Sequence, residues 1–330
     1  MDLQAHISKS LEQAIQEVYA QSSVRSIGGA QEALRERYRN DIASAFKDDR
    51  ERLVYLLARM PLTSVVLEGL LQSLSHVLPT VMSVRDFGAG PATLLWAIYP
   101  RLWPLDRIDL IERDLGIRAL GNSLLKHYPS EALKSSVQWY SSLEQSMDNP
   151  VDLTVSSYSL GEVKAEERSR YVEKLFHQTK EAFVVIEPGS PQGFSVVRDV
   201  REQLISLGAY ILSPCPHQKT CPMPSNDWCH FKMNCVRPKF LQQAKQSRLG
   251  YEEESYSYLI ALKKPFVCTG SRIVRSPLKR SGHVSLDLCT PNGLKRMTMS
   301  KKDGAFYKIA RKSEWGDMID VKGFSEKSDT

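Results

Sequence analysis

The sequence predicts an α/β protein that has helices before its sheet and a small antiparallel β module after it. Three observations support this class. Residues 1–79 show helical periodicity, residues 81–213 alternate short apolar runs with helical stretches, and residues beyond 264 form short alternating runs separated by turn residues. Alternation of strand and helix is typical of a parallel sheet with helices on both faces. We therefore divide the chain into regions 1–79, 80–264 and 265–330.

The N-terminal region is predicted to be helical because its apolar residues recur at intervals of three and four. These residues are Leu11, Ile15, Val18 and Tyr19, then Leu34, Tyr38 and Ile42, then Leu53, Leu56 and Leu57. A stronger amphipathic helix is predicted before Pro79, with Thr63 as its N-cap. Its apolar residues are Val65, Val66, Leu70, Leu71, Leu74 and Leu78.

The central region is predicted to form a sheet, and such sheets bind ligands at the carboxyl ends of their strands. The predicted strands are Val81–Phe87, Arg107–Ile111, Val151–Ser156, Phe183–Glu187, Ala209–Ser213 and Tyr256–Leu262. The predicted helices are Thr93–Ala97, Gly116–His127, Glu166–Thr179 and Ser195–Leu207. Residues 214–231 are rich in proline, cysteine and histidine and are predicted to be a loop.

The C-terminal region is predicted to be a small antiparallel module closed by a helix. Three short alternating runs are separated by Pro277 and by Asn292-Gly293, which favour turns. These strands are predicted at Arg272–Ser276, His283–Leu288 and Leu294–Met299, and the helix at Lys301–Lys312.

The composition is that of an ordinary folded protein. The chain has 330 residues, of which 42% are hydrophobic and 25% charged, which excludes collagen-like, disordered and small disulfide-rich classes. We see no secretory signal, and the apolar stretch Tyr55–Leu71 is interrupted by Arg59 and Glu68. These features predict a soluble, cytoplasmic protein, in which cysteines are more often metal ligands or buried thiols than disulfides.

Positive charge is concentrated in one segment. Between Lys263 and Lys312 there are 13 Lys or Arg residues and two acidic residues, although the whole chain has a net charge of only +6. A basic segment on an acidic body is typical of a module that binds a polyanion, because Lys and Arg on phosphates release counterions. A solvated surface is the alternative.

A glycine turn follows the first predicted strand. Residues 86–93 read DFGAGPAT and lead into a helix predicted to begin near Pro91. Gly88 and Gly90 let the backbone approach a ligand, and the helix start offers N–H donors. A dinucleotide fingerprint has a third glycine where Thr93 stands, and its loss, with Asp86 before the turn, favours adenosyl-methionine over NAD. A plain turn is the alternative.

An acidic residue at the end of the second strand supports a nucleoside cofactor. Glu112 lies 22 residues beyond Gly90, which is the usual offset for a carboxylate that binds ribose hydroxyls. The cofactor residues are therefore predicted to be Asp86, Gly88, Gly90, Pro91, Glu112 and Ser156.

The segment Ser156–Glu162 follows the predicted strand Val151–Ser156, at a position where such folds face the substrate. Tyr158 could stack on a base and Glu162 could orient it, so these two are the catalytic candidates. The two prolines of amino-group nucleic-acid methylases are missing here. A buried tyrosine and a glutamate at a helix start are the structural alternatives.

Three cysteines lie within 15 residues. Cys215, Cys221 and Cys229 are separated by five and seven residues, which is wider than the paired spacing of zinc fingers and ribbons. This spacing favours an iron–sulfur cluster with four thiolates. The fourth ligand must come from Cys235, Cys268 or Cys289, or from His217 or His230. The alternatives are zinc, unligated thiols, and Cys215 as a nucleophile of the kind found in cytosine carbon-5 methylases.

The chain resembles the bacterial branch of the mitochondrial small-ribosomal-subunit methyltransferase-like family. The resemblance covers most of the chain from about residue 80 to Trp315. It rests on Asp86–Pro91, Glu187–Gly189, Pro214–His217, Asp227–Phe231 and Leu249–Glu252. It implies a Rossmann-like class I methyltransferase sheet, adenosyl-methionine, association with the small ribosomal subunit and its RNA, and a four-iron cluster. In that family the fourth thiolate lies far downstream in a short strand, which implies Cys289 here.

The resemblance therefore implies an adenosyl-methionine-dependent methyltransferase-like protein that acts on, or docks to, small-subunit ribosomal RNA. Two other functions are considered. One is a non-catalytic RNA-binding assembly factor that retains a cofactor pocket, and the other is a nicotinamide oxidoreductase, which Thr93 disfavours.

Overall fold

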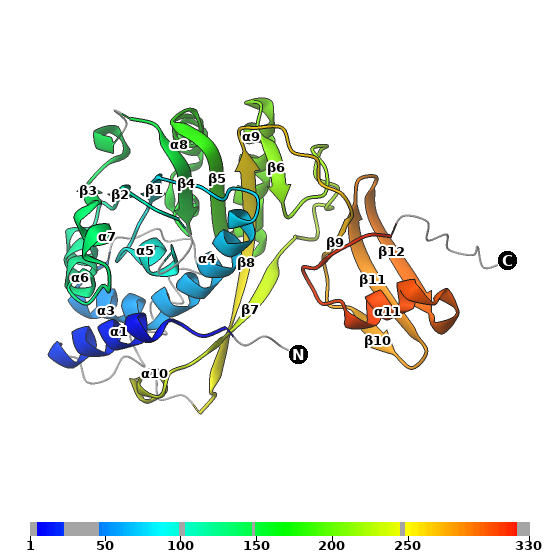
Figure 1. Ribbon diagram of the computed structural model, residues 1–330, viewed down its shortest axis with the longest axis horizontal. Coiled ribbons are helices and arrows are strands. Elements are labelled where there is room, and N and C mark those ends of the chain that lie inside the picture. Colours follow the sequence, from blue (N-terminus) through cyan, green and yellow to red (C-terminus); the bar gives the residue numbers. More distant parts are fainter. Residues whose placement is uncertain (1–4, 23–45, 99–102, 147–148, 245–247, 322–330) are drawn as a thin grey trace. The chain divides into compact units, whose positions relative to one another are not determined.

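The computed structural model describes residues 5–22, 46–98, 103–146, 149–244 and 248–321 (Figure 1). It contains two compact units. The first comprises Met1–Val163, His177–Lys180 and Met233–Glu254, and the second comprises Lys164–Phe176, Glu181–Lys232 and Ser255–Thr330. The helix expected through Leu34, Tyr38 and Ile42 lies outside the described residues. The predicted domain boundaries after residues 79 and 264 remain predictions.

The first unit begins with helices α1 (Lys9–Gln21), α3 (Asp49–Ala58) and α4 (Met60–Ser75). Side chains cap the first two, because Ser8 accepts from the N–H of Leu11 and Asp48 accepts from that of Glu51. Helix α4 starts at Met60 without a side-chain cap. Thr63 is therefore buried inside the helix rather than at its N-cap, and the expected cap was wrong.

Among the described residues, no single helix is long and apolar enough to cross a membrane. Helices α3 and α4 meet that length and composition test only when taken together, and they are bent by 43° at their junction.

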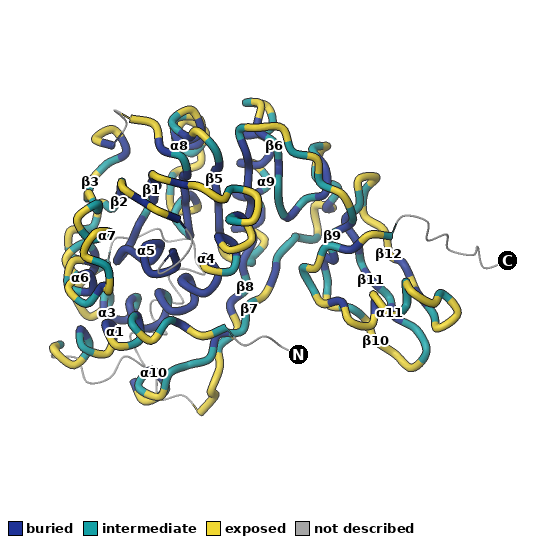
Figure 2. The backbone as a smooth tube through the Cα atoms, in the orientation of Figure 1, coloured by how far each residue is buried: buried dark blue, intermediate teal, exposed yellow. Residues whose placement is uncertain are grey.

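Four parallel strands form the sheet of the first unit, in the order β3-β2-β1-β4. Their bounds are Ser83–Phe87 (β1), Arg107–Ile111 (β2), Val137–Tyr140 (β3) and Val151–Ser157 (β4). Strands β1, β2 and β4 are almost wholly buried (Figure 2). The buried residues include three charged side chains, Arg85, Asp86 and Asp109, each at most 1% exposed.

Short helices connect these strands. They are α5 (Thr93–Ile98), α6 (Leu115–Leu125), α7 (Glu131–Ser135) and η1 (Leu143–Ser146), and the short helix η2 (Leu160–Glu162) follows β4. Asp114 caps α6 by accepting from the N–H of Ile117 at 2.8 Å. The same carboxylate accepts from Nε and Nη2 of Arg52 at 2.7 and 3.0 Å. Helix α3 is therefore bonded directly to the start of α6.

The second unit contains strands β5 (Thr179–Pro188), β8 (Tyr251–Leu262) and β6 (Tyr210–Ser213), with β8 antiparallel to both others. Helices α8 (Ala165–His177) and α9 (Pro191–Ser206) accompany them. Strand β7 (Phe231–Val236) pairs with β8. Residues of β7 from Met233 onward, helix α10 (Lys239–Ala244) and the start of β8 up to Glu254 belong to the first unit. The strands of the α/β region are therefore of mixed direction, whereas the sequence analysis expected a parallel sheet.

The C-terminal part of the second unit is a five-stranded sheet with one helix. Its strands run in the order β10-β11-β9-β13, with β12 also on β11. Their bounds are Ser271–Ile273 (β9), Leu278–Arg280 (β10), His283–Thr290 (β11), Gly293–Ser300 (β12) and Met318–Ile319 (β13). Alternate residues of β11 and β12 point into a core of their own, formed by Ile273, Val284, Leu286, Leu288, Met297, Met299, Ala310 and Ile319.

These elements confirm the predicted α/β class, the N-terminal helices and the C-terminal β module. Two details of the predicted C-terminal module were wrong. The helix expected at Lys301–Lys312 is divided by Gly304, whose φ is +56°, into η3 (Lys301–Asp303) and α11 (Ala305–Lys312). The strand expected at Arg272–Ser276 ends at Ile273.

Candidate functional site

The predicted cofactor residues of the first unit meet at one edge of its sheet. Phe87 of β1 pairs with Ile111 of β2 and with Ser156 of β4. The N–H groups of Gly88 and Ala89 both donate to the carbonyl of Ile111, at 2.9 and 3.0 Å. The turn after β1, the residue after β2 and the end of β4 therefore lie at the carboxyl edge, where such sheets bind ligands.

Glu112 holds the glycine turn in place. Its Oε2 accepts from the N–H of Gly90 at 3.0 Å, and its Oε1 accepts from the N–H of Asp114 at 2.8 Å. Burial raises the pKa of Glu112, and these two backbone hydrogen bonds oppose that rise. Each carboxylate oxygen can accept a further hydrogen bond, so the group can still bind hydroxyls while it fixes the turn.

The two glycines of the turn have positive φ, +76° for Gly88 and +54° for Gly90. A Cβ on Gly88 would lie 2.3 Å from the Cβ of Ser159, and one on Gly90 would lie 3.5 Å from the hydroxyl of Tyr55. The sequence analysis expected the glycines to make room for a ligand. The structure shows that Gly88 makes room for Ser159.

The helix after the turn starts later than expected. It begins at Thr93 rather than near Pro91, because Ala92 has a φ of +66°. Pro91 is buried, and its carbonyl carbon would lie 3.2 Å from a Cβ on Gly121 of α6. Pro91 therefore packs against a neighbouring helix. With only six residues, α5 is too short to offer an anion site at its N-terminus.

Asp86 is the most perturbed acidic residue of this edge. Its side chain is 1% exposed, and its Oδ1 has no hydrogen-bond partner within the described part of the chain. Burial, and to a lesser degree the charge of Glu112, raises the pKa of Asp86 to about 8. A buried carboxyl of this kind is stabilised in its charged form by a cation, so a cationic ligand group is the chemistry that it favours.

The residues after β4 have different neighbours. Ser156 Oγ lies 2.7 Å from Ser159 Oγ, and Ser159 in turn donates to the carbonyl of Phe87 at 2.6 Å. Glu162 is half exposed and forms an ion pair with Arg113 at 3.6 Å.

Tyr158 has a φ of +57°. The guanidinium carbon of Arg59 lies over the ring of Tyr158, 5.2 Å from the ring centroid. Arg59 also donates to both carboxylate oxygens of Glu254, at 2.9 and 2.8 Å. The two catalytic candidates, Tyr158 and Glu162, therefore interact with different arginines.

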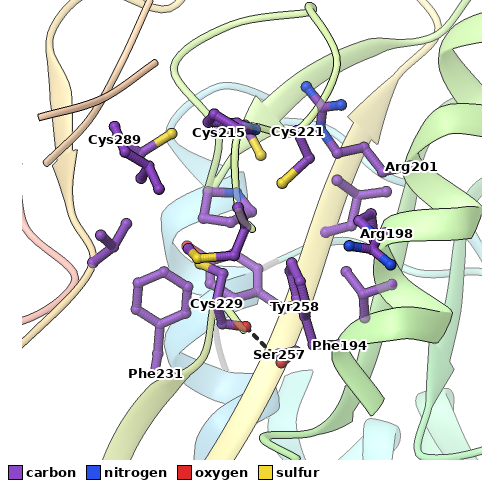
Figure 3. A pocket seen from close by; sticks show the side chains of 17 residues that line it. Phe194, Arg198, Arg201, Cys215, Cys221, Cys229, Phe231, Ser257, Tyr258 and Cys289 are labelled. Carbon is purple, nitrogen blue, oxygen red and sulfur yellow. Dashed lines mark hydrogen bonds between the residues drawn. The ribbon is translucent and has the colours of Figure 1, made fainter. Parts of the chain in front are cut away.

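The four predicted metal ligands line a single pocket of the second unit. Cys215, Cys221 and Cys229 come from the segment between β6 and β7, and Cys289 comes from β11 (Figure 3). The pocket measures about 500 Å³, which includes space open to solvent. Cys235 and Cys268 are not among the residues that line it.

Burial affects the ionisation of three thiols in this pocket. Burial raises the pKa values of Cys215 and Cys229, and that of Cys289 rises to about 12. In the described part of the chain, no three His, Cys, Asp or Glu side chains lie close enough to hold one metal ion. The four sulfur atoms therefore surround a common space without converging on a single point.

A buried arginine shares the pocket. Arg201 of α9 is 2% exposed, and its Nη2 donates to the carbonyls of His217 and Lys219 at 2.9 and 2.7 Å. Its Nε and Nη1 have no hydrogen-bond partner among the described residues. The positive charge of Arg201 opposes the rise in the pKa values of Cys215 and Cys289.

A comparison with protein-family models identifies the family of the chain. The model of the family described as "Mitochondrial small ribosomal subunit Rsm22" matches residues 49–320. The chain belongs to the Rsm22 family. Both sites described above lie inside the matched residues. The Rsm22 match also confirms the family resemblance drawn from the sequence motifs.

Curated relatives of this Rsm22-family chain have names that describe mitochondrial proteins. The human "Ribosome assembly protein METTL17, mitochondrial" is 27% identical over 258 residues, which is 72% of this chain and 55% of the relative. The Schizosaccharomyces pombe "Rsm22-cox11 tandem protein 2, mitochondrial" is 25% identical over 343 aligned residues, or 86% of this chain and 46% of the relative. The chain thus spans about half the length of the curated relatives it matches.

Solved structures with similar folds include several methyltransferases. One is a "putative RNA methyltransferase" from Pyrococcus horikoshii, with a TM-score of 0.39, 15% identity, and coverage of 60% of this chain and 83% of that chain. Another is magnesium protoporphyrin IX methyltransferase from Synechocystis with bound SAM, with a TM-score of 0.40, 9% identity, and coverage of 69% and 90%. These low scores add nothing to the description of this chain's sites.

Four residues of these sites were missed by the sequence analysis. Tyr55 and Arg59 approach the glycine turn and Tyr158 from α3 and its end. Ser159 covers Gly88, and Arg201 enters the cysteine pocket from α9. The one usable signal was the charge of Arg59 between two buried helices, since the other three residues fit ordinary surface or core patterns.

Proposed function

We propose that the chain is an adenosyl-methionine-dependent methyltransferase-like protein that acts on, or docks to, small-subunit ribosomal RNA. The observation that supports this most directly is the meeting of Asp86, the glycine turn and Glu112 at the carboxyl edge of β1 and β2. Family membership and the human relative's name, a ribosome assembly protein, are consistent with it.

Each residue of the edge has a defined part in binding. The carboxyl of Asp86 would face the cationic methionine portion, and Glu112 would accept from ribose hydroxyls while it holds Gly90. Ser156, Tyr158 and Glu162 would border the methyl acceptor. Adenosyl-methionine, once bound, supplies an already activated methyl group. The chain must then mainly align the acceptor, and alignment accounts for much of the rate.

Calorimetry with adenosyl-methionine tests the role of Asp86. Binding of a cation requires Asp86 to be ionised, and its pKa is raised to about 8. We therefore expect affinity to rise as pH increases from 6 to 8, by up to about tenfold per pH unit. Asp86→Asn should lack this pH dependence of the affinity. Because titration of the ligand itself affects both proteins alike, comparing them isolates the contribution of Asp86. Equal pH dependence in the two proteins would contradict the assignment.

A non-catalytic assembly factor is the second candidate function, and two contacts favour it. Both oxygens of Glu112 already accept from backbone N–H groups, and Ser159 rather than open space faces Gly88. Tritium transfer from labelled adenosyl-methionine to isolated small subunits, or to their free RNA, separates the candidates. Binding without transfer supports the assembly factor, and transfer supports the enzyme.

We further propose that Cys215, Cys221, Cys229 and Cys289 bind an iron–sulfur cluster, with zinc as the alternative. The donor set fits because four cysteines are the usual ligands of a four-iron cluster. All four side chains line the same pocket, which supports the proposal. Bound metal would replace the thiol protons and hold the segment between β6 and β7 against β11.

The basic C-terminal module is the proposed RNA contact. Basic side chains are exposed on β12, η3 and α11, namely Lys295, Arg296, Lys301, Lys302, Lys308, Arg311 and Lys312. Clustered cations of this kind bind phosphates with a strong dependence on salt.

The relatives' names place those proteins in mitochondria, and a cytoplasmic location of this chain remains a prediction.

Neutralising four of these cations should weaken binding of small-subunit RNA and reduce its dependence on salt. For Lys302, Lys308, Arg311 and Lys312 changed together to Gln, we expect the slope of log K against log[salt] to fall by about 3. Fluorescence anisotropy with labelled RNA at several salt concentrations measures this slope. A matched control changes Lys9, Lys126, Lys164 and Arg170, which are also exposed. An equal loss in the control would show that the module is not the contact.

A further inference from the structure

The side chain of Arg201 is a buried cation without an acidic partner in the described part of the chain. It is 2% exposed, and its hydrogen bonds go to the carbonyls of His217 and Lys219, to the ring of His217 and to the side chain of Cys215. Arginine does not lose its proton in proteins. A buried charge without a counter-charge destabilises the folded state. The protein therefore gains stability if an anion enters the space beside Arg201.

That space is the cysteine pocket. Arg201 lines it together with the four cysteines (Figure 3), and the Nε and Nη1 donors of Arg201 have no partner among the described residues. Four thiolates around a cluster core of charge 2+, or around one zinc ion, have a net charge of −2. The metal-bound form of the pocket thus supplies the anion that Arg201 lacks.

Two other arginines near the pocket differ from Arg201. Arg272 uses all three nitrogens of its guanidinium, donating to Pro214 O, Gly316 O and Ser213 Oγ at 2.9, 2.6 and 3.2 Å. Arg198, on the same helix as Arg201, is half-buried and lies over the ring of Phe194 at 5.6 Å. Arg201 therefore differs from both, because it is buried in the pocket lining and its Nε and Nη1 can still donate hydrogen bonds.

We propose that Arg201 is the counter-cation of the thiolate site and donates through Nε and Nη1 to its sulfur atoms. This inference rests on the proposed metal site. Outer hydrogen bonds and nearby charge tune such sites. In a redox-active cluster, the positive charge of Arg201 favours the reduced form, which has one more negative charge.

The test compares metal-bound and metal-free protein, using the full chain purified anaerobically and the same preparation stripped with a chelator. We expect metal to stabilise the wild type strongly against heat. Arg201→Gln should lose part of this stabilisation, because the metal-free variant no longer holds an uncompensated charge. The control Arg198→Gln should keep all of it. A purely structural Arg201 would lower both melting temperatures equally, and that result overturns the proposal.

A second readout is the reduction equilibrium of the iron-loaded protein, followed by its visible absorbance during a redox titration. Removing one nearby positive charge should lower the equilibrium constant for reduction about tenfold, which is 59 mV for one electron. Arg201→Lys retains the charge, so its cluster should be reduced over nearly the same range of potentials as that of the wild type.

If Arg201→Gln does not fold, Arg201→Met takes its place in the heat comparison. If neither folds, Arg201→Lys must show reduced metal stabilisation, since one ammonium cannot replace the fork of donors.

The outcomes separate this inference from the proposed function. A wild-type protein that contains neither iron nor zinc overturns the metal site, and the role of Arg201 falls with it. A wild type that contains metal, with Arg201→Gln unchanged in both metal stabilisation and reduction, overturns the role of Arg201 alone.

Discussion

Replacing Cys289 by serine should leave the anaerobically purified protein without bound iron and sulfide. Cys289 lies on β11 and lines the pocket opposite three cysteines of one loop, so its loss removes the ligand that joins two distant segments. A hydroxyl at this position is a poor substitute for a thiolate. The broad absorbance near ~400 nm of a thiolate-bound cluster should disappear, and iron and sulfide analysis should approach zero.

Two other cysteines provide matched controls for this experiment. Cys235→Ser and Cys268→Ser should retain the wild-type spectrum, because neither residue lines the pocket. Loss of iron in Cys268→Ser with retention in Cys289→Ser would reassign the fourth ligand. A colourless wild type with one zinc per chain would replace the cluster by the alternative metal.

Changing Gly88 to alanine should destabilise the protein far more than its φ of +76° alone explains. The new Cβ would lie 2.3 Å from the Cβ of Ser159, and Ser159 is held by its hydrogen bonds to Phe87 and Ser156. Neither the new methyl group nor Ser159 can move away without disrupting the glycine turn. We expect a loss of about 1–3 kcal/mol in the free energy of unfolding from this overlap, added to the cost of the positive φ.

Gly208→Ala measures the second of these costs alone. Gly208 has a similar φ of +88°, but a Cβ there would meet nothing within 4 Å. Urea denaturation of both variants gives the comparison. A double-mutant cycle adds the cause, since Gly88→Ala should cost less when Ser159 is glycine. Equal losses in Gly88→Ala and Gly208→Ala would contradict the steric explanation.

The sequence was sufficient for the elements that have strong local patterns. Strands β1, β2 and β4 are buried along nearly their whole length and were predicted from short groups of apolar residues, although Arg85, Asp86 and Asp109 interrupt them. Strands β3 and β10 were missed because their residues are half-buried or exposed and show no such run. Strand β13 has two residues, which is too short for any periodicity.

The candidate sites divide along the same line. The glycine turn and Glu112 could be predicted because their spacing is local and the turn demands positive φ at fixed positions. The contact of Gly88 with Ser159 joins residues 71 positions apart in the printed sequence, and that of Arg59 with Glu254 joins residues 195 apart. Pairings of this kind depend on how the strands are ordered, which no local pattern encodes.

The bond between Arg52 and Asp114 has a consequence for shortened versions of the chain. Asp114 joins Arg52 through its side chain and Glu112 through its backbone N–H, and Glu112 in turn holds Gly90. The guanidinium of Arg52 keeps the pKa of Asp114 below its usual range, so the ion pair between Arg52 and Asp114 stays charged at neutral pH. A fragment that starts after α3 would have a loosened loop at the top of β1, and a binding defect in it would reflect the missing anchor rather than lost ligand contacts.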